Sequence, residues 1–125
     1  AIRQLLDHPR IRARPAPRSA GAEDAAQRQA GNNLAQRGEA AEDTADFGDR
    51  GNGPGNLRAD YLLPSTSLQV CGSGVFWPRS DDPLFQLIND DTAASSDHRL
   101  VWLDIAVPSV GARAHCTRSA TPTGQ

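Results

Sequence analysis

The sequence predicts a mixed α/β chain whose core comes from its second half, and three observations carry that prediction. Nineteen large apolar residues fall within residues 57–107, whereas only six fall within residues 1–56. Strand-like patterns occur at 57–63, 68–77 and 99–107, and a short helix signal stands between the last two. The first segment cannot bury enough area to offset the entropy of ordering it, so we expect an irregular arm there.

The chain opens with a short helix and then loses regular structure. Three apolar residues lie at helical spacing near the start: Ile2, Leu5 and Leu6. Pro9 must end this helix, because proline lacks the backbone N–H that the next turn needs. Residues 10–56 are rich in Arg, Ala, Gly, Asp, Glu and Pro, which predicts a long surface excursion with an alanine-rich turn near Glu23–Ala30.

Two strands are predicted in the first part of the apolar region. In the segment Leu57–Leu63 successive side chains would alternate between two faces, which places Arg58 and Asp60 on one of them. Pro64 ends this segment. A second strand is predicted at Leu68–Trp77, where a cluster of glycines suggests a bulge or a kink.

A helical turn and a last strand complete the predicted core. Asp82 followed by Pro83 is typical of a helix start, with the aspartate as the N-cap. Four apolar residues of this turn are expected to face inward: Leu84, Phe85, Leu87 and Ile88. Strict alternation predicts a strand at Arg99–Val107, and residues 108–125 are expected to be a disordered tail.

Composition excludes some classes of function. The 125 residues carry 13 basic groups, all arginine, and 15 acidic groups, so the formal charge of -2 argues against broad attraction to nucleic acid or membranes. No apolar run approaches the roughly 20 residues that span a bilayer, so we expect no membrane span.

With only Cys71 and Cys116 available, we expect two unpaired thiols. Because methionine is missing even at position 1, we expect a piece of a longer protein.

Two features of the sequence could carry chemistry. Asp60 stands in an otherwise apolar strand, and the triplet Ser96-Asp97-His98 directly precedes the last strand. A carboxylate among apolar neighbours needs a partner, and an imidazole is a suitable one, so Asp60 would orient His98 and stabilise its charged form. Asp97 would then be available for Mg²⁺ or Mn²⁺, which prefer oxygen ligands.

Structural interpretations of the same residues stay open. An aspartate in a strand commonly lies on the solvated face, and a Ser-Asp pair before a strand is commonly a turn. Arg58 could bind a phosphate group, but its position equally permits a structural ion pair with a nearby acid.

Four runs of sequence resemble the C-terminal end of the endonuclease/exonuclease/phosphatase superfamily, most closely its bacterial and often secreted branch. They are GNLRADYLLPS at 55–65, SGVFWP at 73–78, DDPL at 81–84 and SSDHRLVWLDI at 95–105. The resemblance implies the C-terminal half of a two-sheet α/β sandwich, like that of deoxyribonuclease, and divalent-metal-dependent hydrolysis of a phosphoester. It implies that Asp60 pairs with a catalytic His98, that Asp97 lies on the metal side, and that the protein is secreted or periplasmic.

The resemblance also implies that the active site is incomplete. The chain starts where relatives have passed a Gly-Asp-(Tyr/Phe)-Asn motif, so the missing N-terminal half would supply the metal-binding Glu, an Asp, an Asn and a second histidine. We therefore expect a fragment that is inactive alone, with a substrate that is either nucleic acid or a small phosphate ester. The division is an arm at 1–56, the superfamily segment at 57–107 and a tail at 108–125. The alternative is a structural or partner-binding half-domain with a decayed site.

Overall fold

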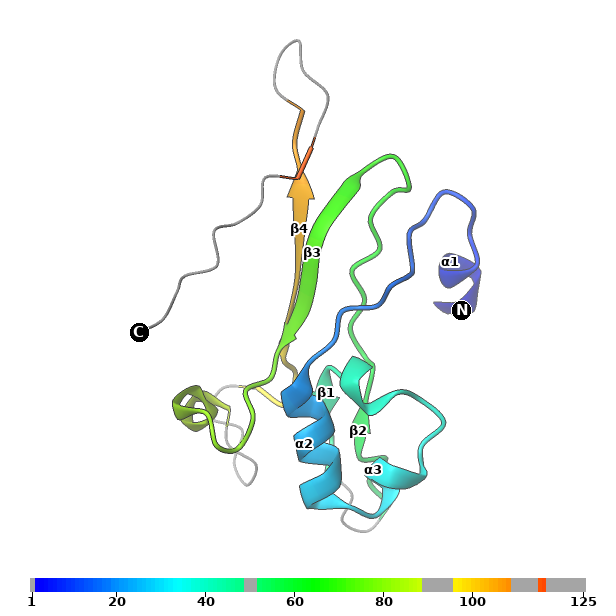
Figure 1. The fold of residues 1–125 in the computed structure, drawn as a ribbon. Helices are drawn as coiled ribbons and strands as arrows, with labels where there is room; N and C mark the ends of the chain where they lie inside the picture. Colours follow the sequence, from blue (N-terminus) through cyan, green and yellow to red (C-terminus); the bar gives the residue numbers. More distant parts are fainter. Residues whose placement is uncertain (1, 49–51, 89–95, 109–114, 117–125) are drawn as a thin grey trace.

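The computed structural model of the chain describes residues 2–48, 52–88, 96–108 and 115–116 (Figure 1). Helical elements are α1 (Ile2–Leu6), α2 (Ala20–Gln29), α3 (Asn32–Ala35) and two 3₁₀ helices, η1 (Ala40–Glu42) and η2 (Pro83–Leu87). Strands are β1 (Ala45–Asp46), β2 (Asn56–Leu57), β3 (Gln69–Phe76) and β4 (Leu100–Ala106). Within these ranges the chain is a small mixed α/β domain with three α-helices and two antiparallel two-stranded sheets.

Helix α2 corrects the expectation of an irregular arm over residues 1–56. Ser19 caps its start, because the Ser19 Oγ accepts a hydrogen bond from Gly21 N at 3.0 Å. Ala22, Ala25 and Ala26 lie at i, i+3 and i+4 spacing and are fully buried. Counting only large apolar residues missed this helix, since its buried face consists of alanine.

The core forms where α2 packs against the end of β3. Its members are Ala22, Ala25, Val75, Trp77 and Ile88. The approach is so close that a Cβ on Gly21 would lie 1.8 Å from the Trp77 carbonyl oxygen. The Ser19 Oγ donates to that same oxygen at 2.7 Å. Only glycine at position 21 therefore permits the observed contact between helix and strand.

A surface carboxylate ties α2 to the loop that follows β3. Ser80 N donates to the Asp24 Oδ2 at 3.0 Å, and the Arg28 Nε donates to the same oxygen at 2.9 Å. The backbone hydrogen bond from Ser80 and then the hydrogen bond and positive charge of Arg28 lower the pKa of Asp24 to about 2, against an opposing effect of burial.

The first sheet is short, and the predicted strand Leu57–Leu63 is wrong beyond its first residue. Strand β2 pairs with β1 in the register Ala45↔Leu57, and no described residue from Arg58 to Leu63 joins a strand. The strand ends early because the next backbone N–H groups bond to a side chain and not to a neighbouring strand. Ala59 N and Asp60 N both donate to the side-chain oxygen of Thr44 and not to a neighbouring backbone carbonyl.

The β3–β4 pair confirms the predicted strands at 68–77 and 99–107 within a residue or two at each end. The strands are antiparallel, with Gly74 opposite Trp102 and a register irregularity between Val70 and Gly72. A Cβ on Gly74 would lie 2.8 Å from the indole ring of Trp102, so the missing side chain makes room for that ring. The two strands form the long ribbon labelled β3 and β4 in the upper half of Figure 1.

The Asp-Pro turn begins where the sequence predicts, but two of its apolar side chains are not buried as predicted. The Asp82 Oδ1 accepts a hydrogen bond from Leu84 N at 2.8 Å, which confirms the N-cap. The turn is a 3₁₀ helix, and Leu84 and Leu87 are exposed although all four apolar residues were expected to face inward. Of the four, Ile88 is buried in the core and Phe85 packs against it.

The expectation of two unpaired thiols is wrong. Cys71 and Cys116 form a disulfide with a Cα–Cα distance of 5.3 Å. Cys71 sits at the irregularity of β3 and Cys116 meets it there, which their separation of 45 residues could not reveal. Most of the predicted tail at 108–125 lies outside the described residues. No helix among the residues that the structure describes is long and apolar enough to cross a membrane.

Candidate active site

His98 and Asp60 meet, as the sequence predicts. The Nδ1 of His98 lies 2.8 Å from the Asp60 Oδ2 and 3.1 Å from its Oδ1, although 38 residues separate them. Both side chains are partly open to solvent, 45% exposed for His98 and 38% for Asp60. The contact occupies Nδ1 and leaves Nε2 without a hydrogen bond to any residue in the described ranges. The imidazole can therefore take or give a proton at Nε2 while the carboxylate holds the ring.

The backbone at His98 is held against β1. Asp46 N donates to the Asp97 carbonyl oxygen at 2.9 Å, and Arg99 N donates to the Thr44 carbonyl oxygen at 2.7 Å. These two bonds flank a β-bridge between Ala45 and His98. The segment 97–99 thus extends the pairing of the first sheet, with β1 between it and β2. His98 and Asp60 consequently meet across β1, and not across directly paired strands.

His98 has two further neighbours, one at its backbone and one at its ring. The Ser96 Oγ accepts a hydrogen bond from His98 N at 3.0 Å, which closes the turn before the strand. The ring of Phe47 meets the ring of His98 edge to face, with 5.5 Å between the ring centroids. The Ser-Asp turn and the contact between His98 and Asp60 therefore coexist, because the turn lies at the backbone of His98 and the contact at its side chain.

Thr44 holds Asp60 and was missed by the sequence analysis. Its Oγ1 accepts hydrogen bonds from Ala59 N at 3.0 Å and Asp60 N at 2.8 Å, and donates to the Asp60 Oδ2 at 2.9 Å. With one donated and two accepted bonds, this hydroxyl makes all the hydrogen bonds available to it. Thr44 is 1% exposed, so the chain Thr44–Asp60–His98 begins in the interior and ends at the surface.

The segment that contains Thr44 has no large apolar residue from which its burial could be predicted. Glu42, Asp43 and Thr44 are three consecutive buried polar residues between small alanines. Burial raises the pKa of the Asp43 carboxyl, whose Oδ2 accepts a hydrogen bond from the Gln36 Nε2 at 2.6 Å. A pattern of polar residues at buried positions resembles a solvated loop when only the sequence is considered, and no other signal in it points to a site.

Asp97 is exposed and directly precedes His98, but a complete metal site does not form around it. Among the described residues there is no group of three or more His, Cys, Asp or Glu side chains placed to hold a metal ion. The nearby Asp46 is already engaged, since its Oδ2 accepts from the Gln29 Nε2 at 2.7 Å and its Oδ1 from Gly48 N. The residues seen here therefore do not suffice for Mg²⁺ or Mn²⁺, and further ligands would have to join Asp97.

Arg58 forms the structural ion pair that was the alternative to phosphate binding. Its Nη1 lies 3.2 Å from the Glu42 Oε2, and its side chain is 13% exposed. Its guanidinium also lies over the ring of Tyr61, 4.5 Å from the centroid. A role for Arg58 toward phosphate stays a prediction.

No family model, curated protein or solved structure matches the chain.

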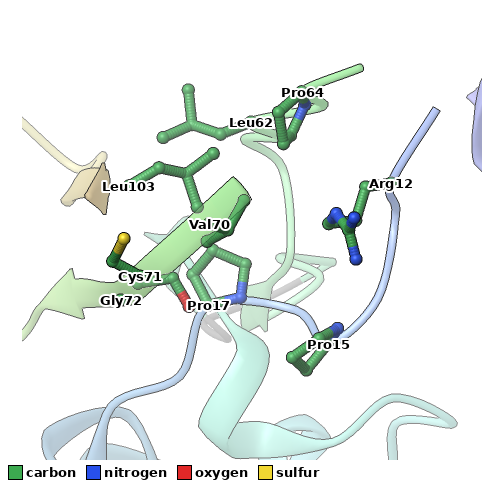
Figure 2. A pocket seen from close by; sticks show the side chains of 10 residues that line it. Arg12, Pro15, Pro17, Leu62, Pro64, Val70, Cys71, Gly72 and Leu103 are labelled. Carbon is green, nitrogen blue, oxygen red and sulfur yellow. The ribbon is translucent and has the colours of Figure 1, made fainter. Parts of the chain in front are cut away.

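An apolar cavity of about 200 Å³ lies away from the His98–Asp60 pair (Figure 2). It opens between residues 12–17, residues 62–64 and the β3–β4 pair. In the close view Leu62, Leu103 and Val70 stand on one side, with Pro15 and Arg12 opposite them. Neither His98 nor Asp60 lines it. The cavity offers few polar groups that could orient a ligand, so the candidate chemistry belongs to the open site at His98.

Proposed function

We propose that this chain supplies the His98–Asp60 part of the active site of a divalent-metal-dependent phosphoester hydrolase, a nuclease or a phosphatase. The contact of 2.8 Å between the two side chains carries the proposal. Asp60 orients the ring and stabilises the imidazolium, while Nε2 exchanges a proton with the attacking water or with the phosphate group. Such acid–base catalysis contributes about 10²- to 10⁴-fold to a rate.

The proposed reaction needs more than these residues supply. Phosphoester cleavage requires a much larger acceleration than acid–base catalysis provides, and a bound metal ion supplies charge neutralisation at the phosphate. We propose Mg²⁺ or Mn²⁺ as the cofactor, with Asp97 as one ligand and the others from the N-terminal half of the same domain. On this proposal the chain is the C-terminal half of a two-sheet α/β sandwich of the deoxyribonuclease kind, and is inactive alone.

Two observations support the finer parts of the proposal. One face of β4 leaves large apolar side chains open to solvent: Leu100 is 67% and Trp102 is 45% exposed. A second half of the domain would cover such a face. The Cys71–Cys116 disulfide suits an oxidising compartment, in agreement with the secreted or periplasmic location that the resemblance implies.

The same exposed face favours one alternative function. A structural or partner-binding half-domain with a decayed active site would use the apolar side of β3–β4 to bind another chain. The reading frame upstream of Ala1 separates the two. A Gly-Asp-(Tyr/Phe)-Asn motif and an earlier metal-binding Glu support the hydrolase, and a start codon directly before Ala1 supports the binding role.

The hydrolase proposal is tested in the complete polypeptide, with the upstream half present. We expect His98→Ala to lower Mg²⁺-dependent hydrolysis of bis(4-nitrophenyl) phosphate by about 10²- to 10⁴-fold while leaving the circular dichroism spectrum unchanged. The matched control is His8→Ala, because His8 is also exposed and its imidazole accepts one hydrogen bond among the described residues, from Arg10 N. Turnover that survives His98→Ala would remove this histidine from the mechanism.

A further inference from the structure

A second cavity, distinct from the apolar one, is lined mainly by arginine. Its volume is about 330 Å³, and it lies between α1, residues 13–14 and the start of the segment after β2. The lining residues are Arg3, Leu6, Asp7, Ala13, Arg14 and Arg58. Three guanidinium groups from distant parts of the sequence thus converge on one space against a single lining carboxylate.

Two of these arginines, Arg14 and Arg58, pair with a buried acid. The Arg14 Nη1 lies 2.7 Å from the Glu42 Oε1, and the Arg58 Nη1 lies 3.2 Å from the Glu42 Oε2. The Glu42 side chain is only 9% exposed, and the Arg18 Nη1 also approaches it at 3.5 Å. Each of these contacts uses one nitrogen of a guanidinium that has five N–H donors. Most donors of Arg14 and Arg58 therefore remain for another acceptor.

Arg3 adds a third positive group to the same cavity. Within the described ranges no hydrogen bond or ion pair engages its side chain. Four arginines, the three that contact Glu42 and Arg3, outnumber three nearby acids: Glu42, Asp7 and Glu39, which pairs with Arg18. The cluster consequently keeps an excess of positive charge in a chain whose formal charge is -2.

We propose that this cavity binds a phosphate group. Guanidinium forks match the oxygens of phosphate and hold it with charge-assisted hydrogen bonds. At about 330 Å³ the cavity far exceeds the roughly 10–15 Å³ that hold one water molecule. Arg58 lies two residues before Asp60 in the sequence, although neither Asp60 nor His98 lines the cavity. The inference does not rest on the hydrolase proposal, because binding needs neither His98 nor a metal ion.

The test is a binding titration of the 125-residue chain in EDTA at low salt. Calorimetry and amide chemical shifts monitor the binding. One arm uses inorganic phosphate and the other uses glycerol 3-phosphate, so that a free anion and an ester group can be told apart. We expect binding in at least one arm, with Arg3→Ala weakening it by about tenfold, which is the effect of losing one charged hydrogen bond. Arg3→Lys should recover part of that loss.

The matched control is Arg37→Ala, which removes the same charge from an exposed position outside the cavity. We expect this variant to bind as the wild type does. Equal weakening by Arg3→Ala and Arg37→Ala would overturn the proposal, because it would show general attraction of an anion to a basic surface. Failure of the wild-type chain to bind either probe at millimolar concentration would overturn it as well. Neither outcome bears on hydrolysis by the complete polypeptide.

Discussion

Replacing Thr44 with valine tests whether one buried hydroxyl organises the candidate site. Valine has nearly the same shape as threonine, so the change removes the hydroxyl with little change in packing. Three hydrogen bonds would be lost: those from Ala59 N, from Asp60 N and to the Asp60 Oδ2. Both backbone donors would be left without their partner, and Asp60 would lose one of the groups that hold its carboxylate.

The expected cost follows from these three bonds. A donor left without a partner costs about 1–3 kcal/mol, and the lower end applies here because Ala59 and Asp60 are not fully buried. Adding the lost bond to the carboxylate, we expect Thr44→Val to lower the free energy of unfolding by about 2–4 kcal/mol. Thr44→Ser keeps the hydroxyl and loses one buried methyl group, which costs about 1 kcal/mol.

Urea denaturation followed by tryptophan fluorescence measures both variants, since Trp77 is buried in the core. Amide hydrogen exchange gives a direct second readout, and we expect faster exchange at Ala59 and Asp60 in the valine variant alone. If valine and serine destabilise the protein equally, or if exchange at these two amides is unchanged, the reasoning about Thr44 is refuted.

Three further predictions concern stability. Gly21→Ala should lower the free energy of unfolding by at least about 3 kcal/mol, because the new Cβ would collide with the Trp77 carbonyl. A melting temperature within about 2 °C of the wild type, which corresponds to roughly half a kcal/mol, would contradict this prediction. Replacing Cys71 and Cys116 together with serine should cost about 2–4 kcal/mol, since the disulfide closes a 45-residue loop; an unchanged urea midpoint would contradict it. Folding lowers the pKa of Asp24 from 3.8 to about 2, so the ionised carboxylate stabilises the fold above pH 3.8. This contribution is lost as the pH falls toward 2. Asp24→Asn should therefore cost about 1–2 kcal/mol at pH 7, with screening included, and almost nothing near pH 2; a cost that does not depend on pH rules out this account.

The candidate pair could be predicted from sequence because its two members belong to recognisable local patterns. Asp60 follows an apolar strand start, and His98 precedes the most regular alternation in the chain. A carboxylate near apolar neighbours requires a partner, so the meeting of Asp60 and His98 was open to prediction. The geometry confirms that contact, whereas the metal role of Asp97 and the phosphate role of Arg58 stay predictions.

The residues that support the pair could not be predicted, because nothing in their own side-chain chemistry indicates that they are buried. Thr44 and Glu42 lie in a polar, alanine-containing segment that has the composition of a loop. They are buried because α2, β2 and the segment 97–99 close around them. Small side chains and hydrogen bonds to distant backbone groups create that burial, and neither has a periodicity that a sequence pattern can show.

The amino-acid sequence by itself determined the strands β3 and β4, the cap at Asp82 and the identity of the acid and the imidazole. These depend on alternation, on capping chemistry and on side-chain charge, which are properties of neighbours in the chain. Only the tertiary structure decided that Asp60 and His98 meet across β1, that Cys71 bonds to Cys116 and that guanidinium groups gather around Glu42. Each of these is a contact between segments far apart in sequence, and such contacts follow from how the segments pack in three dimensions.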